Sequence, residues 1–406
     1  MRLVSDFESE VTSMNKKWIL ASLSGLTLFL ASCNMLPDPA GTEEQPVEQT
    51  DETDGEVAEN NDSVVVETRI DDNYYRPLIT EEGTYEPSQN RGITRSLNSN
   101  VNIKTFEEDL MRLSHKYFST DNHYFQEGQL LPANLATSWL RRAEPLTEEQ
   151  IEEGETILGL NPEDNGNQDP ESRVPNYLSS ILEQDFYIQT DDGIQLAGIS
   201  IGLSLNSVDY YRNDQQQEQQ QEISKEDLLR EGQRIGSEIV SRMRQLEGVG
   251  TVPIMVGLYE QSTRDNFAGG VYISEGLSEN GADSISNWNQ VNESRLVFPV
   301  EGMQSAEGNS FANFKSKVEN FFPNLSGITG VAHYVDDNLV SLQIEIVTQF
   351  YGKGEIIAFT QYLNEAANSY LSENLPIEIK VESLNGIESF LKRDAEETEF
   401  TTHVFN

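Results

Sequence analysis

The chain has 406 residues, and its 69 acidic against 27 basic residues give a net charge of −42 at neutral pH. Such a surface repels phosphate backbones, because nucleic-acid affinity rests on Lys and Arg side chains that release counterions. Nucleic acid is therefore excluded as an expected partner, and the one cysteine, Cys33, excludes an internal disulfide.

The first clear pattern is an N-terminal export signal. Lys16 and Lys17 precede an apolar stretch, residues 18–31, that ends in small residues. The stretch is too short to span a membrane, which takes about 20 apolar residues. Acidic residues before Met14 are unusual at the start of a signal, so translation is expected to begin at Met14. We therefore predict that residues 1–32 are a signal peptide.

The signal ends in the order expected of a lipobox, with the residues Leu30, Ala31, Ser32 and Cys33. This order predicts cleavage before Cys33 and attachment of lipid to its thiol. More than one acyl chain on the new terminus would anchor the protein stably. We expect the mature protein on the outer face of the cell membrane, with the membrane as its partner through lipid on Cys33.

Residues 33–72 are expected to form a disordered acidic tether after the lipidated cysteine. Between residues 34 and 72 there are 13 acidic residues and one basic residue, Arg69. A segment of this composition cannot bury enough apolar surface to offset the entropy lost on ordering it. We interpret it as a solvated spacer of about 35 Å without a specific ligand.

The folded body is predicted to be α+β, with mixed or antiparallel sheets, packed helices and two similar halves, residues 73–262 and 263–406. Near its start, apolar residues spaced three and four apart predict a helix over residues 105–118. Thr147 and Gln150 form a capping-box pattern that predicts the start of a short helix.

The first half then has a hairpin of two strands that turns at residues 191–193. A glutamine-rich loop is expected over residues 215–221. A helix capped by Ser224 follows, and a strand begins at Val252.

The second half repeats the order of hairpin, helix and strand. Its turn is expected at residues 336–338, its helix over 356–370 and the last strand of the chain over 375–381. Each half also has an earlier amphipathic helix, and the second of these contains Phe311 and Phe314. The shared order favours a tandem duplication, and the alternative is that this common order of strands and helix occurs twice by chance.

One string in the sequence matches a catalytic motif, but a structural role explains it better. The string Gly198-Ile199-Ser200-Ile201-Gly202 matches the G-x-S-x-G motif of serine hydrolases, but that motif needs a sharp turn from strand to helix. Here the string lies inside an alternating strand, so a structural role for Ser200 is favoured.

Metal ligation is not indicated either. The Asp191-Asp192 and Asp336-Asp337 pairs lack the pattern of a calcium loop, and turn chemistry explains them better. The four histidines lack zinc-ligand spacing, and they are His115, His123, His333 and His403. We expect no metal, no cofactor and no catalytic residue, and hence a body that is not an enzyme.

One set of residues combines aromatic faces with hydrogen-bonding groups, as ligand grooves do. Packing of aromatic rings in the core, with arginines that extend to solvent, is the alternative interpretation. The candidate groove residues are Tyr74, Tyr75, Arg76, Tyr124, Phe125, Gln126, Glu127, Tyr210, Tyr211 and Arg212.

Several longer strings carry a resemblance to a known family. They are Tyr74-Tyr75-Arg76-Pro77, Arg91-Gly92, the helix from Phe106 to Ser114, Tyr124 to Gln129, Gly159 to Pro162, Ile181 to Asp185, Gly198 to Val208 and Pro253 to Gln261. On these residues the chain resembles the CamS family of sex-pheromone-precursor lipoproteins of Gram-positive bacteria. The resemblance covers the body from about residue 74 to the end.

The resemblance implies an activity in the discarded signal. In this family a short apolar peptide that ends just before the lipidated cysteine can act as a pheromone, inducing conjugative plasmid transfer through a receptor in donor bacteria. The corresponding segment is Leu26, Thr27, Leu28, Phe29, Leu30, Ala31 and Ser32. The resemblance does not explain the role of the body.

Two other classes of function stay open for the body. One is a binding lipoprotein that captures a peptide or a cell-wall polymer in an aromatic groove. The other is a cell-wall hydrolase, which would need two carboxylates about 5 to 10 Å apart in a cleft, one of them with a raised pKa.

Overall fold

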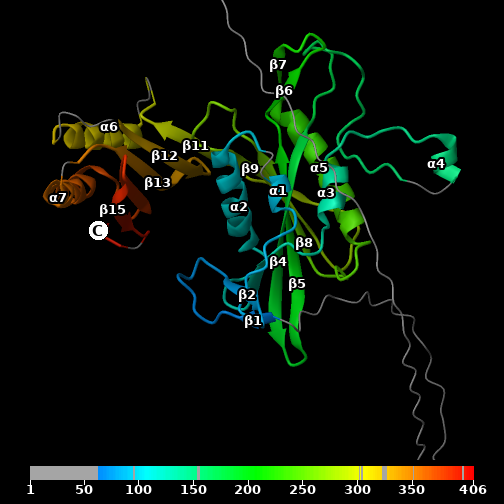
Figure 1. Ribbon diagram of the computed structural model, residues 1–406, viewed down its shortest axis with the longest axis horizontal. Helices are drawn as coiled ribbons and strands as arrows, with labels where there is room; N and C mark the ends of the chain where they lie inside the picture. Colours follow the sequence, from blue (N-terminus) through cyan, green and yellow to red (C-terminus); the bar gives the residue numbers. More distant parts are fainter. Residues whose placement is uncertain are drawn as a thin grey trace, which may run out of the picture. The chain divides into compact units, whose positions relative to one another are not determined.

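The computed structural model describes residues 63–94, 97–152, 156–300, 302, 305–321, 327–350, 352–395 and 397–406. These residues form a mixed α+β fold with two main sheets, as predicted (Figure 1). The helices are α1 (Arg91–Thr94), α2 (Asn100–Ser114), α3 (Ala133–Trp139), α4 (Glu148–Glu152), α5 (Lys225–Met243), α6 (Ala306–Glu319) and α7 (Lys353–Tyr370).

The first sheet has the strand order β1-β2-β3-β4-β5-β8-β9-β10. Its strands are β1 (Ser63–Val65), β2 (Arg76–Thr80), β3 (Tyr124–Glu127), β4 (Leu178–Thr190), β5 (Gly193–Leu205), β8 (Ile254–Glu260), β9 (Val271–Ser278) and β10 (Trp288–Gln290). A separate hairpin pairs β6 (Val208–Arg212) with β7 (Glu218–Glu222).

The second sheet follows chain order from β11 to β16. Its strands are β11 (Glu293–Phe298), β12 (Gly327–Val335), β13 (Asn338–Val347), β14 (Ile377–Ser383), β15 (Gly386–Arg393) and β16 (Thr401–Val404).

The two sheets share one pairing pattern. From β3 to β10 in the first sheet, neighbouring strands pair antiparallel, antiparallel, parallel, antiparallel and antiparallel. The strands from β11 to β16 pair in the same sequence of directions. In both sheets a long helix, α5 or α7, connects the parallel pair. The two sheets thus repeat one order of strand directions, each with a long helix at the parallel step.

The ranges of the halves differ from the expected ones. Strand β9 pairs with β8, and β10 pairs with β9, so the first sheet extends to Gln290 instead of ending at residue 262. Strand β1, at Ser63–Val65, lies inside the segment 33–72 that was expected to be a tether. It pairs with β2, so ordered structure begins before Tyr74.

The two faces of the first sheet carry different helices (Figure 1). On β8, Ile254, Val256 and Leu258 pack in the same core as α3 and α5. Met255 and Tyr259, which alternate with them, pack with α2. Because successive side chains of a strand point to opposite faces, α2 covers one face and α3 and α5 cover the other.

Helix α6 does not match α2 in position, although both were expected as the early helix of a half. Its residues Phe311 and Phe314 share one core with Phe359 and Leu363 of α7. Helix α6 therefore packs beside the connecting helix, as α3 does in the first sheet, whereas α2 lies opposite α5.

Several local predictions are confirmed. Gln150 donates its backbone N–H to Thr147 Oγ1 at 3.3 Å, which is the expected capping box of α4. Asp227 likewise donates to Ser224 Oγ at 3.1 Å, so Ser224 caps α5. Asp336 and Asp337 form the turn of the second hairpin with φ of 48° and 62°, a conformation that Asp tolerates in tight hairpin turns.

Three local predictions differ from the structure. Helix α2 spans Asn100–Ser114 instead of 105–118, because Ser99 caps it by accepting from the Asn102 N–H at 3.2 Å. The glutamine-rich segment 215–221 is a loop only up to residue 217, and from Glu218 it is strand β7, because its backbone pairs with β6. Strand β14 is followed by β15 and β16, so the segment 375–381 does not hold the last strand.

Candidate functional site

The serine of the G-x-S-x-G string lies in the middle of β5, as predicted. Ser200 is fully buried, and its Oγ lies 2.7 Å from Ser114 Oγ at the end of α2. A Cβ on Gly202 would come within 2.8 Å of the ring of Phe106. Gly198, Ser200 and Gly202 therefore place small residues on one face of β5, which lets α2 approach the sheet closely.

The structure brings two of the three predicted groove segments together. Strands β2 and β3 pair in parallel, so Arg76 lies opposite Tyr124 and Pro77 opposite Phe125. The Arg76 guanidinium stacks over the Tyr124 ring, 4.7 Å from its centroid. Tyr75, Tyr124 and Gln126 are buried, which agrees with the alternative of core packing.

The third segment lies elsewhere, so the single expected groove is not formed. Tyr210, Tyr211 and Arg212 belong to β6, which follows the end of β5 opposite Leu178. The β2–β3 segments lie beside the other end of β4, near Tyr187. Along a strand, that separation of about nine residues is about 30 Å. The length of β4 could not be predicted from the sequence pattern, so this separation could not be predicted either.

Tyr210 and Tyr211 take part in a different arrangement at the β6–β7 hairpin. The guanidinium of Arg173 lies 3.9 Å from the Tyr211 ring centroid, and that of Arg264 lies 4.0 Å from the Tyr210 ring centroid. Arg173 also pairs with the buried Asp209 carboxylate. These stacked cations secure the hairpin to neighbouring loops.

Tyr74, Phe125 and Glu127 line a cavity of about 710 Å³ that we name the α2 cleft. One wall is α2, and the opposite wall is the polar face of the second sheet. A third wall is formed by β3, β4 and the loop before α1. The residues that line these walls include Glu107, Glu108, Met111, His115, Gln184, His333, Ser341, Gln343 and Glu378.

The residues on the second sheet were not predicted as site residues. On β13, Ser341 and Gln343 face the cleft, whereas Leu342 and Ile344 face the core with α6 and α7. Alternation along this strand separates one apolar from one polar face. This alternation is visible in the sequence, but the sequence does not show which element packs opposite the polar face.

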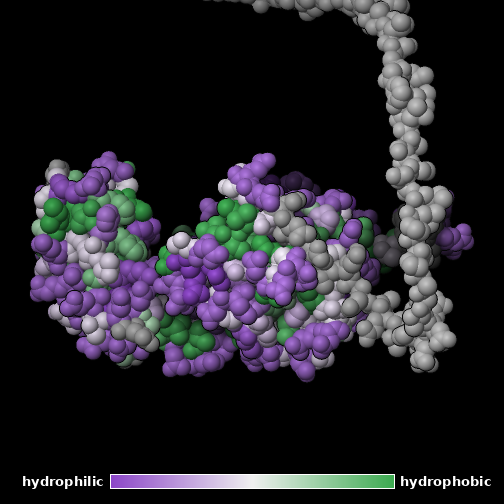
Figure 2. All heavy atoms as spheres, turned by 90° about the horizontal axis from the view of Figure 1, so that it is seen from below, coloured by the Kyte–Doolittle hydropathy of each residue, from purple (hydrophilic) through white to green (hydrophobic). Residues whose placement is uncertain are grey.

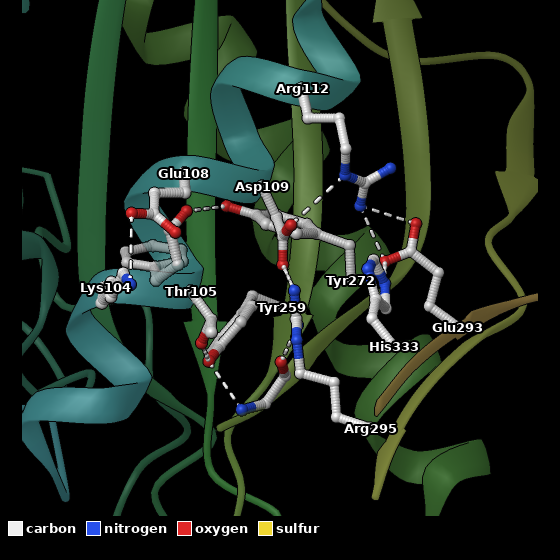
Figure 3. A network of polar contacts seen from close by, with 12 residues as sticks. Lys104, Thr105, Glu108, Asp109, Arg112, Tyr259, Tyr272, Glu293, Arg295 and His333 are labelled. Atoms are coloured by element: carbon white, nitrogen blue, oxygen red, sulfur yellow. Dashed lines mark hydrogen bonds and ion pairs between the residues drawn. The ribbon is translucent and has the colours of Figure 1, made fainter. Parts of the chain in front are cut away.

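A polar network joins α2 to β11 and β12 at the edge of the cleft (Figure 3). Asp109 accepts hydrogen bonds from Arg112 Nε at 3.2 Å and from Arg295 Nη2 at 2.7 Å. Arg112 Nη2 lies 2.7 Å from both carboxylate oxygens of Glu293. His333 Nε2 lies 3.1 Å from Glu293 Oε2.

The network stabilises a charge that is buried. The Glu293 side chain is only 1% exposed. Burial alone would raise the pKa of Glu293, but hydrogen bonds and charge from His333 and Arg112 outweigh burial, and the pKa is lowered. This arrangement fixes α2 against the second sheet and leaves the neighbouring cleft open.

A pair of buried carboxylates, Glu183 and Asp185, lies on β4, and Glu183 is part of the inner wall of the cleft. Burial raises the pKa of Glu183 to about 7 and raises that of Asp185 well above its ordinary value, with repulsion from Glu183 as a second cause. Glu183 accepts from the backbone N–H groups of Leu130 and Leu131 at 3.1 and 3.0 Å, and Asp185 from that of Gln129 at 2.9 Å. The pair therefore anchors the loop after β3.

No group of three or more His, Cys, Asp or Glu side chains with metal-site geometry occurs in the part of the chain that the structure describes. The predicted turn pairs and histidines are dispersed over separate elements. Cys33, the lipobox and the segment Leu26–Ser32 lie outside the described residues. Among the described helices, none combines the length and apolar character needed to cross a membrane.

Comparisons with known proteins identify relatives of the folded body. A crystal structure of a sex pheromone precursor from Lactobacillus salivarius is 34% identical, with a TM-score of 0.76, and the match covers 85% of this chain and 99% of that one. The C-terminal domain of the sex pheromone staph-cAM373 precursor from Staphylococcus aureus is 26% identical, with a TM-score of 0.66, over 77% and 99% of the two chains. No curated protein matches.

The model of one protein family matches residues 85–399, and its description is CamS sex pheromone cAM373 precursor. This match includes α2, the strands from β3 to β15 and the lining residues of the α2 cleft from Tyr85 onward. The chain therefore belongs to the CamS family of sex pheromone precursors.

Proposed function

We propose that this chain is a surface lipoprotein, held on the outer face of the cell membrane by lipid on Cys33. The observation that carries the proposal is membership of a family of sex pheromone precursors. The sequence around Cys33 supports it, because a basic head, an apolar stretch and the order Leu30-Ala31-Ser32-Cys33 precede the acidic segment.

The pheromone activity is proposed for the segment Leu26–Ser32, which export would release from the signal. The segment is uncharged and mostly apolar, so it would suit a hydrophobic groove in a receptor of donor bacteria. The folded body would then remain on the membrane after the peptide has left.

Two measurements test this proposal on the full-length chain. Mass spectrometry of the membrane fraction is expected to find the mature terminus at Cys33 with lipid attached, and the Cys33→Ser variant is expected in the soluble fraction. If that variant stays in the membrane as firmly as the natural chain, the anchor is not at Cys33.

The peptide is tested separately. Synthetic Leu26–Ser32 is expected to raise the frequency of conjugation in a responding donor, and a peptide of the same composition in scrambled order is the control. Equal frequencies with the two peptides in all donors would exclude a pheromone role for this segment.

We also propose that the body is not an enzyme. The two arrangements closest to catalytic groups support this, because Ser200 and Asp185 are fully buried and both carboxylate oxygens of Glu183 already accept from backbone N–H groups. A nucleophile or general acid has to reach its substrate. Incubation of the full-length chain with purified cell walls is expected to release no soluble fragments; release that disappears in an Asp185→Asn variant would show a carboxylate-dependent hydrolase.

A further inference from the structure

The α2 cleft has the size and lining of a ligand site. Its volume of about 710 Å³ lies in the range of small-molecule and peptide pockets. Met111, Phe125 and Leu182 give it an apolar surface, and side-chain amides and carboxylates surround them. Apolar walls with a few convergent polar groups are typical of binding sites, so the lining of the cleft favours a ligand there.

Two polar atoms in the cleft have no hydrogen-bond partner within the described part of the chain. Gln184 is 4% exposed, and its Nε2 donates to the Glu107 carbonyl at 3.2 Å, whereas its Oε1 is unpaired. His115 Nε2 is also unpaired. A buried polar atom without a partner costs about 1 to 3 kcal/mol, so a ligand that satisfied both atoms would recover that free energy.

Two carboxylates lie on different walls of the cleft. Glu378 on β14 lines the cleft, and no basic nitrogen of a described residue lies within 4 Å of its carboxylate. Glu108 on α2 faces the same space and forms an exposed ion pair with Lys104 at 3.9 Å. Burial raises the pKa of Glu108, attraction to Lys104 lowers it, and repulsion from Asp109 and Glu378 makes smaller contributions that raise it.

The charges on both walls therefore favour a cation between them. The basic side chains of the cleft are already engaged, because Arg91 pairs with Glu127, Arg112 and Arg295 pair with Asp109, and Lys104 pairs with Glu108 across exposed surface. Figure 2 shows hydrophilic residues over much of one face of the molecule. The whole chain carries a net charge of −42, so an anionic ligand would be repelled. A ligand rich in N–H donors and carrying an ammonium group fits this lining.

The cleft is elongated along α2. From Lys104 to His115 the helix rises by about 16 Å, which matches an extended peptide of about five residues. An extended peptide also presents backbone N–H groups at regular intervals to acceptors such as Gln184 Oε1.

We propose that the α2 cleft binds a short extended peptide with a basic side chain, whose ammonium group lies between Glu108 and Glu378 and whose backbone N–H groups bond to Gln184. This inference does not depend on the lipid anchor or on the released segment of the signal. It assigns a ligand to the folded body, whose role neither the anchor nor the released segment explains.

The test uses the full-length chain in detergent micelles, with isothermal titration at physiological salt. The probes are pentapeptides of alanine with one Lys, Gln or Glu at the centre. The Lys peptide is expected to bind about tenfold more tightly than the Glu peptide, which corresponds to about 1.4 kcal/mol. Chitotetraose, an uncharged glycan of similar length, is expected to bind more weakly than the Lys peptide.

Variants distinguish the cleft from general attraction to an acidic surface. Glu378→Gln is expected to weaken binding of the Lys peptide about fivefold and to leave the Gln peptide unchanged. Glu365→Gln, an exposed position on α7 outside the cleft, removes the same charge and serves as the matched control. A second variant, Glu108→Gln, should act as Glu378→Gln does, and thermal unfolding checks that each variant is folded.

Three results would overturn the inference. Equal affinity for the Lys and Glu peptides would exclude recognition of a cation. An equal effect of Glu378→Gln and Glu365→Gln would mean that the attraction is not local. Tighter binding of chitotetraose than of any peptide would assign the cleft to a glycan instead.

Discussion

Arg112 on α2 and Glu293 on β11 are 181 positions apart in the chain, yet Arg112 Nη2 lies 2.7 Å from both oxygens of the Glu293 carboxylate. The carboxylate is almost wholly buried, and His333 bonds to it from the next strand. This contact ties the helix on the first sheet to the edge of the second sheet, beside the α2 cleft.

Loss of the arginine is expected to destabilise the protein. Arg112→Leu would leave the Glu293 charge buried with His333 as its remaining close partner, and breaking a buried pair on one side costs about 3 kcal/mol. Urea unfolding followed by circular dichroism would measure the free energy of unfolding. Arg230→Leu, which breaks an exposed pair with Asp227 on α5, is the control and is expected to leave that free energy unchanged. Equal effects of the two variants would contradict a special role for the buried pair.

The Glu183–Asp185 pair predicts a stability that falls as pH rises. The folded pKa of Glu183 is raised from 4.5 to about 7 by burial, so its contribution is fully present below pH 4.5 and is lost as pH rises through 7. The size of the change is about 3 kcal/mol. Unfolding curves at intervals from pH 4 to pH 8 would measure this change in the free energy of unfolding.

The Asp185→Asn variant isolates this pair. An asparagine can still accept from the Gln129 N–H, and its amide would donate permanently to Glu183, so the variant is expected to lose much of the pH dependence between 4.5 and 7. It should also be more stable than the natural chain at pH 8. A pH profile that is parallel to that of the natural chain would show that other groups cause the dependence.

The close approach of α2 to β5 predicts a strong effect at Gly202. A Cβ there would lie 2.8 Å from the Phe106 ring and 2.9 Å from Tyr272 Oη, and both side chains are fully buried. Gly202→Ala is expected to lower the free energy of unfolding by about 1 to 3 kcal/mol. Gly327→Ala, where no atom lies within 4 Å of the added Cβ, is expected to change it by less than about 0.5 kcal/mol.

A double variant tests the cause. Phe106→Leu makes room beside the added methyl group, so the effect of Gly202→Ala should be smaller in that background than in the natural chain. Strict additivity of the two substitutions would mean that the loss comes from backbone strain instead of overlap with Phe106.

Substitution by glycine is expected to have opposite effects on stability in the two hairpin turns. Asp337 has a φ of 62°, a conformation that costs non-glycine residues free energy, so Asp337→Gly is expected to stabilise the protein by about 0.5 kcal/mol. Asp192, in the first hairpin turn, is not among the described residues with positive φ, and Asp192→Gly is expected to destabilise it by a similar amount. Shifts of the same sign in thermal unfolding would contradict this difference.

The local elements could be predicted from the sequence because their signals lie within a few residues. Thr147 and Gln150 are three positions apart, and the alternation around Ser200 marks a strand over a short window. The same reasoning failed at residues 218–221, where a polar composition typical of a loop forms a strand because its backbone pairs with β6. Here a partner strand, rather than the composition, decided the structure.

The candidate site could be predicted only in part. Tyr74, Phe125 and Glu127 do line the α2 cleft, but Tyr210 and Tyr211 lie beyond the other end of β4. An aromatic composition selects residues that can bind a ligand, but it contains no information about distance between segments. The length and pairing of β4 and β5 set that distance.

By itself, the sequence determined the acidic charge, the family resemblance, most helices and the turns of both hairpins, because charge, capping and periodicity act between near neighbours. Only the tertiary structure decided that the first sheet extends to Gln290 and that Gln184 and Glu378 face one cleft. Those relationships depend on which strands pair and which helix covers each face. Pairing is fixed by the packing of the whole core, so residues nearly 200 positions apart meet without any mark in their local pattern.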